Sequence, residues 1–83
     1  MQNARVYVWL KQDVLDPQGR TITKALHELG YGHVSNVRQG KAFDISLDEN
    51  GLDEQELLSS LDEMSKRLLS NPVIEDFKVE LLK

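Results

Sequence analysis

The stretch VLDPQG at residues 14–19 decides how the chain turns from its first predicted strand into its first predicted helix. Asp16 can cap a helix, because its carboxylate accepts a hydrogen bond from a backbone N–H group of the first turn. Pro17 suits the first helical position, where a missing N–H group costs nothing. The same residues also suit a type I turn with Asp16 first, Pro17 second and Gly19 last. With either geometry, the chain turns sharply here and enters a helix.

Hydrophobic periodicity predicts the elements on both sides of this corner. Aliphatic residues alternate with polar and aromatic ones over residues 4–11, which predicts a strand. Apolar residues at helical spacing predict a helix over residues 17–29. The apolar stripe of this helix comprises Ile22, Ala25, Leu26 and Leu29. Gly30 follows at the position where a left-handed C-terminal cap is expected.

The remaining elements are predicted from alternation and from a capping signal. Residues 34–47 are strand-like, but a glycine in their middle indicates a bulge or a bend, so one long strand and two short strands both remain open. A capping-box-like start at Asp53 precedes a helix predicted over residues 54–69. Residues 73–82 alternate again and are predicted to form the last strand.

The resulting element order is β-α-β(-β)-α-β, which predicts an α+β two-layer sandwich. We expect two helices to lie on one face of a small, mainly antiparallel sheet. The chain has 83 residues, and no linker, low-complexity segment or repeat divides it. A single domain over residues 1–83 is therefore expected.

The first predicted strand carries large side chains on both faces. Tyr7 and Trp9 lie opposite the alternating aliphatic residues, and Ala42 and Leu82 are candidates for the same outer face. Aromatic side chains of this kind are enriched at contacts between proteins. We interpret this face as one that another chain covers. The alternative is an exposed aromatic pair, which monomers tolerate.

Composition restricts the classes of function. The net charge of −4 argues against nucleic-acid binding, which needs a basic footprint, and against an anionic membrane surface as partner. The absence of Cys excludes a disulfide framework and a thiolate metal site. No apolar run reaches the roughly 20 residues that span a bilayer. The first residues lack the apolar segment of a signal peptide, so we expect a cytoplasmic protein.

Candidate catalytic residues are few. His27 lies opposite the apolar stripe of its helix, and His33 lies in a predicted turn. A general base must lie within hydrogen-bond reach of the proton that it moves, and no second group stands at a suitable spacing. The acidic residues between positions 48 and 56 are explained by a turn and a helix start, where negative charge is favourable. We predict no catalytic residue and no metal ligand in this chain.

Two basic spots are the remaining candidates for binding. Arg20 and Lys24 stand near the predicted helix start at the corner, where backbone amides can bind an anion. A capped turn with solvated basic residues is the favoured interpretation there. Arg38 and Lys41 flank Gly40, and a solvated strand edge explains them equally well.

A series of stretches in this sequence resembles the PurS family, the small subunits of phosphoribosylformylglycinamidine (FGAM) synthase. These stretches are Lys11, VLDPQG at 14–19, AL at 25–26, LGY at 29–31, VRQGK at 37–41 and the predicted strand at 43–47. Their order and spacing over residues 11–47 make the resemblance specific, whereas residues 48–83 match in pattern and length. Asp44 departs from it, because a Glu is expected there in this family.

The resemblance implies a non-catalytic subunit of an ATP-dependent glutamine amidotransferase complex. In this family a homodimer or tetramer joins a glutaminase subunit to a large synthetase subunit and assists ammonia transfer. The complex converts formylglycinamide ribonucleotide to formylglycinamidine ribonucleotide in de novo purine biosynthesis. ATP and Mg would be used by the synthetase subunit, so no cofactor is expected on this chain. A dimer partner would extend or cover the sheet.

The resemblance and the aromatic face together define the predicted subunit contacts. They are Tyr7, Trp9, Asp16, Pro17, Gln18, Gly19, Arg38, Gly40 and Lys41. The alternative function is an ACT-like regulatory domain that binds amino acids. Such domains are also small α+β sandwiches that dimerise, and fold alone does not settle function.

Overall fold

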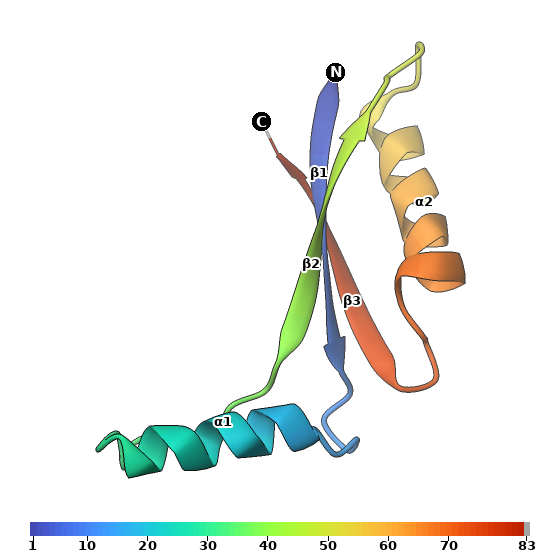
Figure 1. Ribbon diagram of the computed structural model, residues 1–83. Helices are drawn as coiled ribbons and strands as arrows, with labels where there is room; N and C mark the ends of the chain where they lie inside the picture. Colours follow the sequence, from blue (N-terminus) through green and yellow to red (C-terminus); the bar gives the residue numbers. More distant parts are fainter. Residues whose placement is uncertain (83) are drawn as a thin grey trace.

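The computed structural model describes residues 1–82, which form a three-stranded sheet and two helical segments (Figure 1). The strands are β1 (Gln2–Leu10), β2 (Gly40–Leu47) and β3 (Glu75–Leu82), in the sheet order β2-β1-β3. Both neighbours of β1 run antiparallel to it. The helical segments are α1 (Pro17–Glu28), α2 (Glu54–Met64) and the π-helical turn η1 (Ser65–Leu69) that continues α2. The predicted α+β class and the antiparallel sheet are confirmed.

The core lies between β1 and α2. Ala4, Val6 and Val8 point to one face of the sheet and are buried, as the alternation in β1 predicts. On this inner face Val6 stands between Phe43 of β2 and Val79 of β3. Two leucines of α2 close the core from above, Leu57 with 4% and Leu61 with 0% of their surface exposed.

The ends of α2 and β3 show how local hydrogen bonds set element boundaries. The predicted capping box is present, because Asp53 Oδ1 accepts from Glu56 N at 2.8 Å and Glu56 Oε1 accepts from Asp53 N at 3.3 Å. The last turn is π-helical, since Ser70 N donates to Ser65 O five residues earlier. β3 begins at Glu75, two residues later than predicted, because residues 71–74 form a turn in which Glu75 N donates to Asn71 O.

The segment 34–39 is not a strand, so neither of the two predictions for residues 34–47, one long strand or two short ones, is correct; residues 40–47 alone form a strand, β2. Two backbone donors of the segment 34–39 bond to side chains around α1 instead of to a neighbouring strand. Val37 N donates to Thr23 Oγ1 at 2.9 Å, and Gln39 N donates to Asp16 Oδ2 at 2.7 Å. The segment is therefore tied to α1 up to the point where β2 enters the sheet.

The position of α1 corrects the prediction that both helices cover one face of this sheet. α2 lies along the sheet, whereas α1 extends beyond the end of the strands (Figure 1). Its predicted stripe is consequently open to solvent, and Leu29 has 73% of its surface exposed. The predicted C-terminal cap is confirmed: Gly30 has φ +102°, and Tyr31 N donates to Leu26 O at 2.9 Å.

The outer face of the sheet combines the predicted aromatic side chains with ion pairs. The strand register places Tyr7 beside Ala42 and Asn3 beside Leu82, so all four predicted apolar residues lie on this face. Arg5 pairs with Asp44 at 2.7 Å, and Lys11 pairs with Asp76 at 2.7 Å. Trp9, with 40% of its surface exposed, lies at the end of the sheet that is nearest to α1.

Candidate interaction site

The corner between β1 and α1 is organised by the carboxylate of Asp16, which is 5% exposed. Its Oδ1 accepts from Gly19 N at 2.9 Å and thereby caps α1, so the helix-cap interpretation of the sequence is the correct one. Its Oδ2 accepts from Gln39 N at 2.7 Å and thereby holds the segment that leads into β2. The hydrogen bonds from Gln39 and Gly19 lower the pKa of this carboxyl below its ordinary value.

Gly19 is buried against the segment 34–39, and only a residue without a side chain fits there. A Cβ atom at this position would lie 2.2 Å from Val37 O and 2.8 Å from Asp16 Oδ2. Thr23, one turn later, donates to Gly19 O at 2.8 Å while it accepts from Val37 N. The close approach lets α1 and the segment run side by side.

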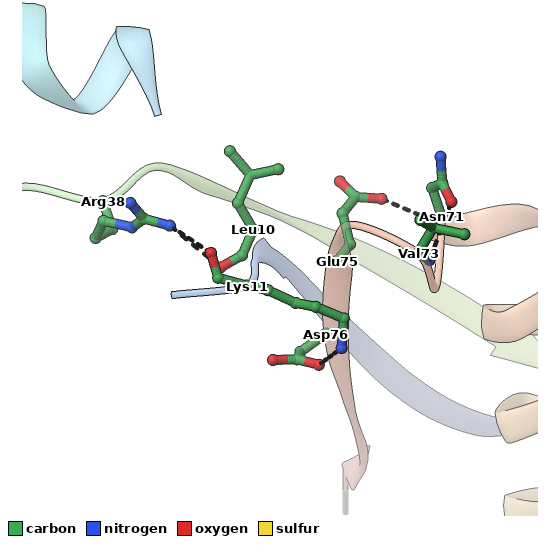
Figure 2. A network of polar contacts seen from close by, with 7 residues as sticks. All are labelled: Leu10, Lys11, Arg38, Asn71, Val73, Glu75 and Asp76. Atoms are coloured by element: carbon green, nitrogen blue, oxygen red, sulfur yellow. Dashed lines mark hydrogen bonds and ion pairs between the residues drawn. The ribbon is translucent and has the colours of Figure 1, made fainter. Parts of the chain in front are cut away.

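Arg38 ties the same segment to the end of β1. Its Nη2 donates to Lys11 O at 2.8 Å, with Leu10 O at 3.5 Å (Figure 2). It also donates to Val14 O at 3.0 Å. Figure 2 also shows the Lys11 side chain turned the other way, toward Asp76 of β3. The connection from β1 to α1 is thus held from both sides.

A shallow pocket of about 210 Å³ opens beside this corner, at the end of the sheet. Its lining combines side chains from the corner, from β1 and from both edge strands. These residues are Val8, Trp9, Leu10, Asp16, Gln18, Gln39, Gly40, Lys41 and Glu75. The amides of Gln18 and Gln39 bond to each other at its edge. The pocket therefore joins the corner to the ends of all three strands.

The structure brings together five of the nine predicted contact residues, since Trp9, Asp16, Gln18, Gly40 and Lys41 all line this pocket. The other four, Tyr7, Pro17, Gly19 and Arg38, lie outside it. The two basic side chains predicted to form one spot around Gly40 have different partners. Arg38 donates to the backbone of residues 11 and 14, whereas the Lys41 ammonium lies 5.8 Å from the centre of the Phe43 ring.

Comparison with known proteins decides the family. The sequence profile of PurS, described as phosphoribosylformylglycinamidine (FGAM) synthase, matches residues 3–83. The chain is 41% identical to phosphoribosylformylglycinamidine synthase subunit PurS of Methanocaldococcus jannaschii over 83 residues, covering 100% of this chain and 98% of that protein. This chain belongs to the PurS family. The PurS subunit of Bacillus subtilis is also 41% identical, over 98% of this chain and 93% of its own length.

Solved structures of PurS proteins have the same fold as this chain. The crystal structure of Methanocaldococcus jannaschii PurS has a TM-score of 0.87, covering 100% of this chain and 98% of that one. A chain in the structure of PurLQS from Thermotoga maritima has a TM-score of 0.82 at 25% identity, covering 98% of this chain and 96% of that one. The fold of PurS extends over the whole of this chain. The assignment favours a complex subunit over the ACT-like alternative.

Two polar residues of this PurS corner were missed from the sequence. Gln39 supplies the N–H group that Asp16 binds, and Thr23 supplies a hydroxyl that joins α1 to residue 37. The resemblance included Gln39 within VRQGK but gave it no role. The spacing of Thr23, one turn beyond Gly19 on α1, was a readable signal, because side chains four residues apart share a helix face.

Among residues 1–82, neither helix has the length and apolar character that a membrane crossing requires. Within the same residues, His, Asp and Glu side chains do not gather in a group of three that could hold a metal ion.

Proposed function

We propose that this chain is the small, non-catalytic subunit of an FGAM synthase complex in purine biosynthesis. In this proposal a homodimer of the chain joins a glutaminase subunit to a large synthetase subunit and assists the passage of ammonia between them. The names of the PurS relatives and of the PurLQS complex support this role. ATP and Mg would be used by the synthetase subunit, and the complex would act in the cytoplasm.

The observation that carries the proposal is that the chain by itself leaves α1 uncovered. A compact protein of this length has a radius of gyration of about 12 Å. This chain has a radius of gyration of 16.4 Å and extents of 53 × 27 × 14 Å. Leu15 and Leu29 of the α1 region have 62% and 73% of their surface exposed. Apolar surface on a protruding helix favours association with another chain.

A second copy of this chain supplies the matching surface. Phe43, Ile45 and Leu47 of β2 point to the inner face and are only half-buried, because α2 packs on the β3 side of the sheet. The α1 stripe of a partner would cover these side chains. In a symmetric dimer the exchange is reciprocal, so each α1 would complete the core of the other copy.

The larger subunits would then meet surfaces that the dimer leaves open. We assign this role to the pocket beside the corner, with Trp9, Gln18, Gly40 and Lys41 as contacts, and to the neighbouring Tyr7 and Pro17. The shape of this surface is fixed by the contacts that Asp16, Gly19 and Arg38 make with neighbouring groups of the chain. Side chains of fixed position give register and specificity to a docking surface.

The dimer is tested with two leucines of similar exposure. Leu29 lies on the α1 stripe, and Leu68 lies on η1 with 83% of its surface exposed. We expect Leu29→Glu to convert the native dimer to a monomer by light scattering after gel filtration. Leu68→Glu should leave the native mass unchanged. Equal masses for wild type and Leu29→Glu would contradict the proposed dimer.

The role in the complex is tested by reconstitution. The glutaminase and synthetase subunits are assayed for glutamine-dependent formation of formylglycinamidine ribonucleotide, with and without this chain. We expect glutamine-dependent activity only when the wild-type chain is present, and a loss with Leu29→Glu. Activity from free ammonia should need the synthetase subunit alone. Full glutamine-dependent activity without this chain would contradict the proposal.

A further inference from the structure

The connections at the base of α1 form a closed set of hydrogen bonds that is separate from the core. We call the side chains of Asp16, Thr23 and Arg38 the corner brace. Each of them joins two segments that are distant in sequence. Asp16 and Thr23 bind the backbone N–H groups of Gln39 and Val37, and Arg38 binds backbone carbonyl groups of residues 11 and 14.

The corner brace acts where hydrophobic packing does not. The buried apolar side chains are those of β1 and α2, so the core does not fix the direction of α1. A helix joined to a sheet by two flexible connections would sample many orientations. The corner brace joins the two connections, residues 11–16 and residues 34–39, to each other by hydrogen bonds. Gly19 permits this by bringing α1 within contact of Val37 O.

Rigid placement changes the cost of association. An arm that is disordered before binding must lose its conformational freedom when it docks, and this loss weakens the complex. An arm that is already fixed binds with that cost removed. Two of the three bracing residues use ionised groups, whose hydrogen bonds are the stronger ones.

We propose that Asp16, Thr23 and Arg38 are positioning residues that hold α1 at a fixed angle to the sheet, so that its apolar stripe is presented preformed to a second copy of the chain. This inference rests on the proposed dimer. Asp16 and Arg38 therefore act on subunit assembly through the orientation of α1, in addition to shaping the surface of the corner.

The test measures the dimer dissociation constant by analytical ultracentrifugation for Asp16→Ala, Thr23→Val and Arg38→Met. We expect each variant to weaken the dimer at least tenfold. Thr23→Ser keeps the hydroxyl group and should stay within about threefold of wild type. Arg67→Met is the control for lost charge, because within residues 1–82 Arg67 pairs only with Glu63, on the surface at 3.2 Å, and it should leave the constant unchanged.

A second readout separates positioning from general stability. In hydrogen exchange on the wild-type chain, the amides of Gly19, Val37 and Gln39 should be protected even at concentrations at which the chain is monomeric. In Thr23→Val, exchange should accelerate at Val37 and along α1, while the β1 amides keep their protection. Unprotected wild-type amides at these positions would overturn the inference, including the case in which a variant fails to fold.

The outcomes also separate this inference from the dimer itself. A wild-type chain that stays monomeric overturns the proposed dimer and the positioning role together. A wild-type dimer whose dissociation constant is unchanged in all three variants overturns the positioning role alone.

Discussion

The two helices of this protein are built alike and placed differently. Each begins at an Asp cap whose carboxylate accepts from the N–H group three residues later, Asp16 for α1 and Asp53 for α2. Each carries an apolar stripe. Leu61 of α2 is completely buried on the sheet, whereas Leu29, the C-cap residue of α1, is 73% exposed. An apolar stripe therefore indicates that a helix packs against another surface, but it does not show whether that surface belongs to the same chain or to another.

The connections explain the different placement. α2 follows the turn after β2, where Asn50 and Gly51 both have positive φ, and it returns along the sheet (Figure 1). α1 is followed by the segment 34–39, in which the N–H groups of residues 37 and 39 donate to Thr23 and Asp16. That segment runs back beside α1 and keeps it at the end of the strands.

The two helices should differ most in the free energy of unfolding that is lost when one leucine of each is replaced by alanine. Leu61→Ala removes a fully buried side chain and should lower the free energy of unfolding by about 2–5 kcal/mol. Leu29→Ala should lower it by less than about 0.5 kcal/mol in the monomer, because the site is exposed. Urea unfolding at several protein concentrations checks both values.

Concentration distinguishes the two effects further. Because a dimer is stabilised by mass action, Leu29→Ala should lose stability only at concentrations at which the wild type is dimeric. Leu61→Ala should lose stability at all concentrations. A loss for Leu29→Ala that persists at high dilution would place α1 on its own sheet and remove the contrast.

A smaller effect is expected from two glycines around α1. Gly19→Ala places a methyl group against Val37 O and should cost about 1–3 kcal/mol in thermal unfolding. Gly32→Ala is the matched control and should change little, because within residues 1–82 no atom beyond the two chain neighbours lies within 4 Å of the added Cβ. If both variants melt alike, α1 and the segment 34–39 are not held in contact in solution.

The sequence was a good guide wherever a structure depends on neighbours along the chain. The caps at Asp16 and Asp53, the Gly30 terminus and the alternation of β1 are all local signals, and each prediction was confirmed. The corner residues were recognised through the family resemblance. Their contribution to one pocket became visible only in the structure.

The sequence failed where a group had two available partners. The amides of residues 37 and 39 fit an extended pattern, but the side chains of Thr23 and Asp16 bind them in place of a strand. The prediction that α1 covers the sheet of its own chain was wrong because periodicity carries no information about distant contacts. Arg38 was predicted as a subunit contact; its side chain is exposed, and it also donates to the backbone of residues 11 and 14, which the sequence did not indicate.

The cap of α2 offers a third, smaller test. Asp53→Ala removes the acceptor for Glu56 N and should cost about 1 kcal/mol in urea unfolding. Asp53→Asn retains an acceptor oxygen and should recover most of that loss. Equal losses for both variants would mean that charge at the helix start, and not the hydrogen bond, carries the effect.

The smallest expected effect is a difference in acid response at Asp16. Because hydrogen bonds from Gln39 and Gly19 lower its pKa in the folded chain, the folded state binds this proton less readily than the unfolded state. Its contribution to stability is therefore complete above the ordinary Asp pKa of about 3.9 and is lost as the pH falls through the lowered value. NMR titration of the Gly19 and Gln39 amides should accordingly give a midpoint below about 3.9. Asp16→Asn should abolish that titration, and a wild-type midpoint at or above the ordinary value would show that these two amides do not hold the carboxylate in solution.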